Sequence, residues 1–225
     1  MKKGMIFDLD GVLVFTDHFH YLAWKKLADR LNIEFNESMN NQLRGISRQD
    51  SLELILKERS TDYSEAEKRK LAEEKNGYYR EFLQQMSPLD VSDEVRNILR
   101  WLKGRGYQLA VGSSSKNAPF ILQRTQLSGY FDAVADGNHI TRSKPDPEVF
   151  LKAAEYLGLS PFDCAVVEDA RAGIQAAKAG GMTAIAMGDA VGANEADYTL
   201  DSLSDLPALI TKMEHSFKTS MQSPF

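Results

Sequence analysis

Cysteine and long apolar runs are what this sequence most clearly lacks. Cys164 is the only cysteine among 225 residues, which excludes an internal disulfide and fits a reducing compartment. No apolar run approaches the roughly 20 residues that cross a bilayer, and the first residues do not have the pattern of a secretory signal. We therefore expect a cytoplasmic protein without a membrane anchor, and we expect Cys164, which begins an apolar run, to be a core residue.

Clusters of positive charge are lacking as well. The chain carries 27 Lys and Arg residues against 32 Asp and Glu residues, for a net charge of −5 at pH 7. Proteins that bind nucleic acid usually carry a basic patch or stripe, and no such run occurs here. We therefore expect no nucleic-acid or membrane partner, and a monomer that acts on small molecules. A local basic pocket for a phosphate group is still compatible with an acidic average.

Short apolar runs that alternate with amphipathic segments fill most of the chain. Repeated strand–helix units predict a parallel sheet with helices on both faces, so the expected fold class is α/β with a Rossmann-like three-layer core. The tail from residue 215 is polar and aperiodic, and we expect it to be frayed. The predicted strands are residues 5–7, 107–111, 131–135, 165–167, 182–187 and 198–200, and the predicted core helices are residues 95–102, 119–126, 147–157, 172–179 and 203–213.

Residues 16–87 have a different pattern. Apolar residues recur at helical spacing from His20 to Leu31, and nothing in this region is typical of a strand. We therefore predict that residues 16–87 form an all-helical cap domain, inserted after the first strand of a core made of residues 1–15 and 88–225. Further helical stretches in the cap are predicted at residues 37–43, 47–58 and 64–85.

Two carboxylates, Asp8 and Asp10, follow the first predicted strand. Residues two apart in a strand point to the same face, so both are expected to face one spot at the carboxyl end of the strand, where ligands bind in open α/β sheets. Neighbouring carboxylates resist joint ionisation unless a cation lies between them, and Mg²⁺ prefers such oxygen ligands. Alone, an Asp-x-Asp pair is more often a polar turn.

Three further motifs also follow strands. Ser113 leads from a strand into a helix, where a hydroxyl and backbone N–H groups suit a phosphate. Lys144 lies between a strand and a helix, and Glu168 and Asp169 close another strand. Taken singly, each has an ordinary explanation, namely a helix cap, a solvated lysine and an acidic surface turn. Their joint occurrence, each just past a strand end, favours one shared site.

Residues 7–13, followed by these three motifs in this order, resemble the signature of the haloacid dehalogenase-like hydrolase superfamily, whose members mostly transfer phosphoryl groups through an aspartyl phosphate. The resemblance implies that Asp8 is the nucleophile and Asp10 the general acid and base, roles that suit carboxyl groups. It also implies that Lys144 neutralises the nucleophile and the transferring phosphate. The implied Mg²⁺ ligands are Asp8, the carbonyl of Asp10, Asp169 and, directly or through water, Glu168.

Further motifs at residues 20–25, 43–52, 75–76 and 113–120 are similar to the phosphoglucomutases of this superfamily, and the similarity covers residues 1 to about 210. Those enzymes interconvert β-glucose 1-phosphate and glucose 6-phosphate. The resemblance implies sugar-phosphate substrates, with glucose 1,6-bisphosphate as intermediate and activator. The implied phosphate- and substrate-binding residues are His20, Trp24, Arg44, Gly45, Ser47, Arg48, Ser51, Lys75, Ser113, Ser114, Ser115, Lys116, Asn117 and Lys144.

Arg48 is the candidate for binding a second phosphate group. A mutase must hold two phosphates at once, and the planar fork of Arg48 suits the phosphate that is not reacting. Residues 115–117 would complete that distal site from the core, and the resemblance implies that His20 helps to align Asp10. Taken alone, His20 and Trp24 would be explained as packing residues of the first cap helix. Arg48 would be explained as a solvent-exposed residue at the start of a helix.

Two residues depart from the family pattern, and two other functions compete with a mutase. Phe15 stands where the family usually has an acid at the hinge into the cap, and Arg44 stands where lysine is frequent. A sugar-phosphate phosphatase, in which water accepts the phosphoryl group, does not require the distal site. A catalytically silent phosphosugar-binding protein is disfavoured because Asp8 and the other signature residues are intact.

Overall fold

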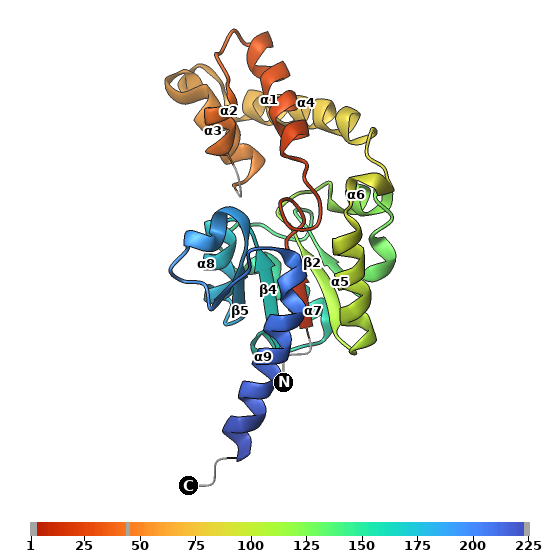
Figure 1. The fold of residues 1–225 in the computed structure, drawn as a ribbon. Coiled ribbons are helices and arrows are strands. Elements are labelled where there is room, and N and C mark those ends of the chain that lie inside the picture. Colours follow the sequence, from red (N-terminus) through yellow and green to blue (C-terminus); the bar gives the residue numbers. More distant parts are fainter. Residues whose placement is uncertain (1–3, 44–45, 223–225) are drawn as a thin grey trace.

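Six parallel strands form the centre of the protein (Figure 1). The computed structural model describes residues 4–43 and 46–222. The strands lie in the order β3-β2-β1-β4-β5-β6, and all neighbours are parallel. The strand that precedes Asp8 is therefore in the middle of the sheet. The bounds are β1 Gly4–Phe7, β2 Gln108–Gly112, β3 Ala133–Ala135, β4 Cys164–Glu168, β5 Thr183–Ala186 and β6 Tyr198–Thr199.

Both faces of the sheet are buried. In β1, Met5 and Phe7 belong to the core cluster on one face, whereas Ile6 belongs to the cluster on the other. A strand that is covered on both faces reads as a continuous apolar run, as this one does. The first face is covered by α5 (Asp93–Gly104), α6 (Ala118–Arg124) and α9 (Leu206–Gln222), and the second by α7 (Glu148–Leu157) and α8 (Arg171–Ala179). The predicted three-layer α/β fold is confirmed.

The end of the chain differs from the prediction. The last helix was expected at residues 203–213, but residues 203–205 form a 3₁₀ turn and α9 continues to Gln222. The expectation of a frayed tail from residue 215 was therefore wrong as far as Gln222. Leu206 and Ile210 anchor the first turns of α9 in the core. Extending a helix costs little once it has begun, and no glycine or proline occurs in residues 208–222.

Short 3₁₀ helices occur at several connections and were not predicted. They are η1 Lys57–Asp62, η2 Pro88–Asp90, η3 Ser128–Tyr130, η4 Pro161–Asp163, η5 Gly188–Gly192 and η6 Leu203–Asp205. Within the described residues, no helix combines the length and the apolar character that a membrane crossing requires.

Four helices of the inserted region form a separate group beyond the sheet (Figure 1). They surround a core cluster of their own, which includes Trp24, Leu27, Leu52 and Leu71. The long helix α4 begins with a capping box that Ser64 forms with Glu67. The bounds are α1 Asp17–Arg30, α2 Glu37–Asn41, α3 Arg48–Leu56 and α4 Glu65–Leu83.

We predict that the cap depends on its own core, and α3 offers a matched pair of leucines to test this. Leu52 is fully buried, whereas Leu54 on the same helix is 48% exposed. Leu52→Ala should lower the free energy of unfolding by about 2–5 kcal/mol, and Leu54→Ala by about 0.5 kcal/mol or less. Urea titration of both variants measures the difference. Equal effects would show that the cluster around Leu52 does not stabilise the protein.

Candidate active site

Asp8 lies at the carboxyl end of the central strand. Its backbone N–H donates to the carbonyl of Val167 over 3.0 Å, so the pairing of β1 with β4 extends one residue past β1. Lys144 Nζ donates to Asp8 Oδ1 over 2.5 Å and to Glu168 Oε2 over 2.8 Å. Burial alone would lower the pKa of Lys144, but the two carboxylates outweigh it and raise this pKa. A buried ammonium group therefore lies between two buried carboxylates.

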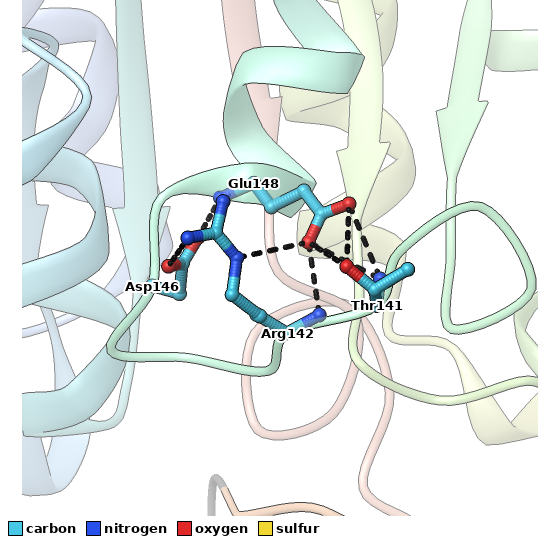
Figure 2. A network of polar contacts seen from close by, with 4 residues as sticks. All are labelled: Thr141, Arg142, Asp146 and Glu148. Carbon is cyan, nitrogen blue, oxygen red and sulfur yellow. Dashed lines mark hydrogen bonds and ion pairs between the residues drawn. The ribbon is translucent and has the colours of Figure 1, made fainter.

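The loop that carries Lys144 is fastened by Glu148, the first residue of α7. Figure 2 shows the Glu148 carboxylate facing the loop. It accepts hydrogen bonds from the backbone N–H groups of Thr141 and Arg142 over 3.1 and 2.9 Å, and from the Thr141 hydroxyl over 3.0 Å. Arg142 also pairs with Asp146 over 3.1 Å. Because the loop is closed on both sides of Lys144, its backbone is held in place there.

Three carboxylates meet next to this lysine. Asp8, Glu168 and Asp169 each offer an oxygen within 4.8 Å of the others. Two glycines leave room for them: a Cβ on Gly11 would lie 1.9 Å from Asp169 Oδ2, and one on Gly173 would lie 2.0 Å from the carboxylate carbon of Glu168. This donor set fits a hard divalent cation such as Mg²⁺, which takes oxygen ligands.

Burial makes the charge on these acids costly. Burial and the charge of Asp8 raise the pKa of Asp169 to about 7. Burial, which the Lys144 ammonium only partly offsets, raises the pKa of Glu168 to about 8. A divalent cation bound by these groups stabilises their ionised forms. The same acids that repel one another are therefore suited to holding a metal ion.

Asp10 lies in the turn after β1 and forms an isolated bridge with Val14. The Thr16 hydroxyl donates to the Asp10 carboxylate, and the Tyr79 hydroxyl donates to Thr16 over 3.0 Å. Burial and the charge of Asp8 raise the pKa of Asp10 to about 7. A carboxyl group with a pKa near 7 can both give and accept a proton close to neutral pH.

The turn after β2 presents hydroxyl and N–H groups. Ser113 Oγ accepts from the Ser115 N–H over 3.1 Å, and Ser115 Oγ accepts from the Asn117 N–H over 3.2 Å. The Ser114 hydroxyl is buried and has no hydrogen-bond partner in the part of the chain that the structure describes. A phosphate oxygen would satisfy it. Asn117 instead donates to Asn76 of α4 over 2.9 Å, a bond that joins the core to the cap.

The cap contributes basic side chains that lie close to one another. Lys75 is buried, with Nζ 2.8 Å from His20 Nδ1 and 4.6 Å from the centre of the Trp24 ring. Burial and the charge of Arg48 lower the pKa of Lys75 well below its usual range, and burial and the charge of Lys75 do the same for His20. Bound anions stabilise the charged forms of such groups.

His20 reaches Asp10 through other side chains. Its ring lies 4.1 Å from the ring of Tyr79, and Tyr79 bonds Thr16, which bonds Asp10. An alignment of Asp10 by His20 would therefore pass through Tyr79 and Thr16.

Arg48 begins α3 and extends toward α4. Ser47 caps this helix by accepting from the Asp50 N–H over 3.1 Å, and the Ser51 hydroxyl donates to the Ser47 carbonyl over 2.9 Å. Arg48 Nη1 donates to Glu73 Oε1 of α4 over 2.9 Å. The predicted arginine is thus held by an acid that was not predicted.

A cavity of about 770 Å³ brings the core and cap residues together. Asn117 does not line it, and Arg44 and Gly45 lie outside the described residues. The predicted site residues that line it are Asp8, Asp10, His20, Trp24, Ser47, Arg48, Ser51, Lys75, Ser113, Ser114, Ser115, Lys116, Lys144, Glu168 and Asp169. The structure therefore gathers residues from both ends of the sequence at one place.

Several lining residues were not predicted. Thr16, Glu73 and Thr141 line the cavity, as does Phe15, which is 74% exposed. Thr16 lies only six residues after Asp10, and this short separation is the one local signal that could have indicated it. Glu73 has no such signal, because its partner Arg48 is 25 residues away.

Comparisons with known proteins agree with this geometry. The family model for haloacid dehalogenase-like hydrolase matches residues 2–181. The chain is 42% identical over 206 residues to a β-phosphoglucomutase of Bacillus subtilis, covering 91% of each chain. It is 33% identical to a fructose-1-phosphate phosphatase of Escherichia coli, covering 81% of this chain and 94% of that one. A crystal structure of β-phosphoglucomutase from Clostridium difficile superposes with a TM-score of 0.91 at 34% identity, covering 97% of this chain and all of that one.

We predict that Gly11 is required for the position of Asp169. Gly11 has φ +86°, a conformation that side chains disfavour, and a Cβ there would overlap the Asp169 carboxylate. Gly11→Ala should weaken Mg²⁺ binding about 10- to 100-fold, the usual effect of disturbing a group that orients a metal ligand. Calorimetric titration with Mg²⁺ measures this. Gly129→Ala is the control, because a Cβ there meets nothing within 4 Å. Unchanged affinity in Gly11→Ala would show that Gly11 is not required to position a metal ligand.

Proposed function

The chain belongs to the haloacid dehalogenase-like hydrolase family, and we propose that it acts as a β-phosphoglucomutase, interconverting β-glucose 1-phosphate and glucose 6-phosphate. One observation carries this proposal: the cavity that contains Asp8 also contains Arg48 of the cap and Lys116 of the core. A phosphatase needs one phosphate site. A mutase that forms a bisphosphate needs two, and arginine suits the second.

In the first step, the Asp8 carboxylate attacks phosphorus and forms a mixed anhydride. The bond from phosphorus to the sugar oxygen breaks, and that oxygen keeps the electron pair and takes a proton from Asp10. Lys144, whose ammonium already contacts Asp8, neutralises charge on the transferring group. In the reverse sense, an acceptor hydroxyl gives its proton to Asp10 as its oxygen attacks the phosphoryl group and frees Asp8.

Two such transfers make the isomerisation. Phosphorylated Asp8 gives its phosphoryl group to the 6-hydroxyl of β-glucose 1-phosphate, which forms glucose 1,6-bisphosphate. The bisphosphate binds again in the opposite orientation, and Asp8 removes the phosphoryl group from carbon 1, which leaves glucose 6-phosphate. We propose that the bisphosphate is thus the intermediate and, added in trace amounts, the activator that phosphorylates the enzyme.

The remaining groups bind and orient the substrate. Mg²⁺ would be held by Asp8, Asp169, Glu168 and the carbonyl of Asp10, and when bound it neutralises charge on the transferring phosphate. The buried Ser114 hydroxyl, Ser113 and the N–H groups of their turn suit the oxygens of that phosphate. We assign the distal phosphate to Arg48, Ser115, Lys116 and Asn117, and the sugar to His20, Trp24, Arg44, Gly45, Ser47, Ser51 and Lys75.

We propose that residues 16–87 act as a cap that closes over this site. Closure removes water, which competes with the sugar for the phosphoryl group. The bond from Asn117 to Asn76 already joins the two parts next to Lys75. Phe15 is the last core residue before the cap and lines the cavity, so it is placed to affect closure.

We predict that Asp8→Asn abolishes turnover, because an amide cannot form the aspartyl phosphate. ³¹P NMR of β-glucose 1-phosphate with Mg²⁺ and a trace of the bisphosphate should show glucose 6-phosphate with the unaltered protein and no change with the variant. Circular dichroism checks that the variant is folded. An active variant would overturn the covalent mechanism, and free phosphate as the main product of the unaltered protein would make it a phosphatase.

We predict that Arg48→Ala selectively removes the distal phosphate site. Turnover of glucose phosphates should fall about 10- to 150-fold, the effect of losing a charge-assisted contact. Phosphorylation of Asp8 by acetyl phosphate should change little, because this donor is too small to need a distal site. The ratio of hydrolysis to isomerisation should rise. Steady-state rates with both donors measure this.

A matched arginine in the cap provides the control. Arg30 of α1 pairs with Glu74 of α4 over 2.6 Å, as Arg48 pairs with Glu73, but neither Arg30 nor Glu74 lines the cavity. Arg30→Ala should leave both rates near normal. If Arg48→Ala slowed both donors equally, Arg48 would serve the structure of the cap or the proximal site. If it slowed neither, the distal assignment would fail.

A further inference from the structure

The part of the cavity wall that the cap contributes contains an acid that the mechanism above does not use. Glu73 lines the cavity, and its carboxylate accepts the hydrogen bond of Arg48 Nη1 over 2.9 Å. Among the described residues, Glu73 is the only acid that pairs with Arg48. The carboxylate therefore occupies one N–H group of the guanidinium to which the distal phosphate is assigned.

The two partners are exposed to different degrees. The Arg48 side chain is 21% exposed, whereas that of Glu73 is 69% exposed. A guanidinium group that is partly withdrawn from water is stabilised by a neighbouring anion, because burial penalises its charge. An exposed carboxylate, in contrast, loses little when it returns to water. Glu73 can therefore leave Arg48 and return to water at little cost, provided that another anion binds Arg48.

A bisphosphate intermediate places opposite demands on Arg48. The distal phosphate must be gripped during each transfer, and it must be released between the two transfers so that the bisphosphate can bind in the opposite orientation. Release leaves a half-buried cation without an anion unless the protein supplies one. A carboxylate on the neighbouring helix supplies it without leaving the cavity wall.

We propose that Glu73 competes with the distal phosphate for Arg48 and takes this arginine over whenever the phosphate leaves. Glu73 is thus a positioning residue that limits how tightly the distal site holds a phosphate. This inference deepens the proposed function and rests on it for the need to reorient a bisphosphate. The competition itself requires only that a phosphate binds Arg48.

The experiment compares Glu73→Gln with Glu74→Gln. Both substitutions remove one negative charge from adjacent positions of α4, but Glu74 pairs with Arg30 outside the cavity. Glu73→Gln should lower the KM for β-glucose 1-phosphate, and the dissociation constant for inorganic phosphate by calorimetry, about 2- to 5-fold, the range expected for losing a partly exposed ion pair. The value of kcat should not rise, because release of the bisphosphate becomes slower. Glu74→Gln should change neither constant.

A double-mutant cycle assigns the effect to Arg48. In an Arg48→Ala background, Glu73→Gln should no longer tighten phosphate binding, because the group for which the two anions compete is absent. An equal gain in that background, or an equal gain from Glu74→Gln, would mean a general charge effect and would overturn the proposal. Weaker phosphate binding in Glu73→Gln would also overturn it, because Glu73 would then hold Arg48 ready for the phosphate.

These outcomes are separate from a failure of the proposed function. If the unaltered protein released free phosphate and formed no glucose 6-phosphate, the mutase proposal would fail. Phosphate binding that tightens in Glu73→Gln only when Arg48 is present would still establish the competition. If isomerisation is observed and Glu73→Gln does not tighten phosphate binding, the competition fails and the mutase proposal stands.

Discussion

Buried negative charge at one edge of the sheet is the constraint on which the rest of the structure depends. The parallel order of the strands brings Asp8, Glu168 and Asp169 to the same edge, and Asp10 follows in the next turn. Carboxylates taken out of water are destabilising unless cations compensate them. Lys144 supplies one such cation, at 2.5 Å from Asp8 and 2.8 Å from Glu168. The bonds of Glu148 that fasten the lysine loop, and the glycines that leave space for carboxylates, serve this same arrangement.

The cap supplies basic side chains to the other wall of the cavity. Lys75 and Arg48 lie in its wall of the cavity, and Lys75 is buried. Burial and mutual repulsion lower the pKa of Lys75 in the same way that they raise the pKa of Asp10 and Asp169. The core edge is therefore suited to a metal ion and the cap wall to an anion. A phosphorylated sugar that binds with a divalent cation satisfies both, which couples occupation of the site to contact between the two parts.

Local sequence patterns predicted the fold and the residues at the strand ends, but not the side-chain pairs that connect the site residues. The strand ends were readable because an apolar run followed by Asp8, Ser113 or Glu168 is a short-range signal, and parallel topology then requires these ends to share one edge. The pairs that tune the site were not readable. Arg48 meets Glu73, Tyr79 meets Thr16 and Asn117 meets Asn76 across 25, 63 and 41 residues of sequence. No periodicity encodes such pairs, because they depend on how α4 packs against α1, α3 and the core. The length of α9 was underestimated because the polar end of this helix has little amphipathic pattern. The helix continues there because no residue in that segment interrupts it.

The residues of the core alone do not determine whether a sugar hydroxyl or water accepts the phosphoryl group. In the mechanism we propose, a mutase and a phosphatase both pass through an aspartyl phosphate, so both would use Asp8, Asp10, Lys144 and a metal ion. What differs is whether a second phosphate holds the acceptor in place while the site is closed, and we propose that Arg48 and its neighbours bind that phosphate. Binding energy at a phosphate that does not react can be used in this way to favour one acceptor over another. The contact with the distal phosphate must also be released in every cycle. A bisphosphate that cannot rebind in the opposite orientation would not undergo the second phosphoryl transfer. An arginine that is largely buried yet paired with an exposed carboxylate meets both requirements, since each anion that leaves can be replaced by the other.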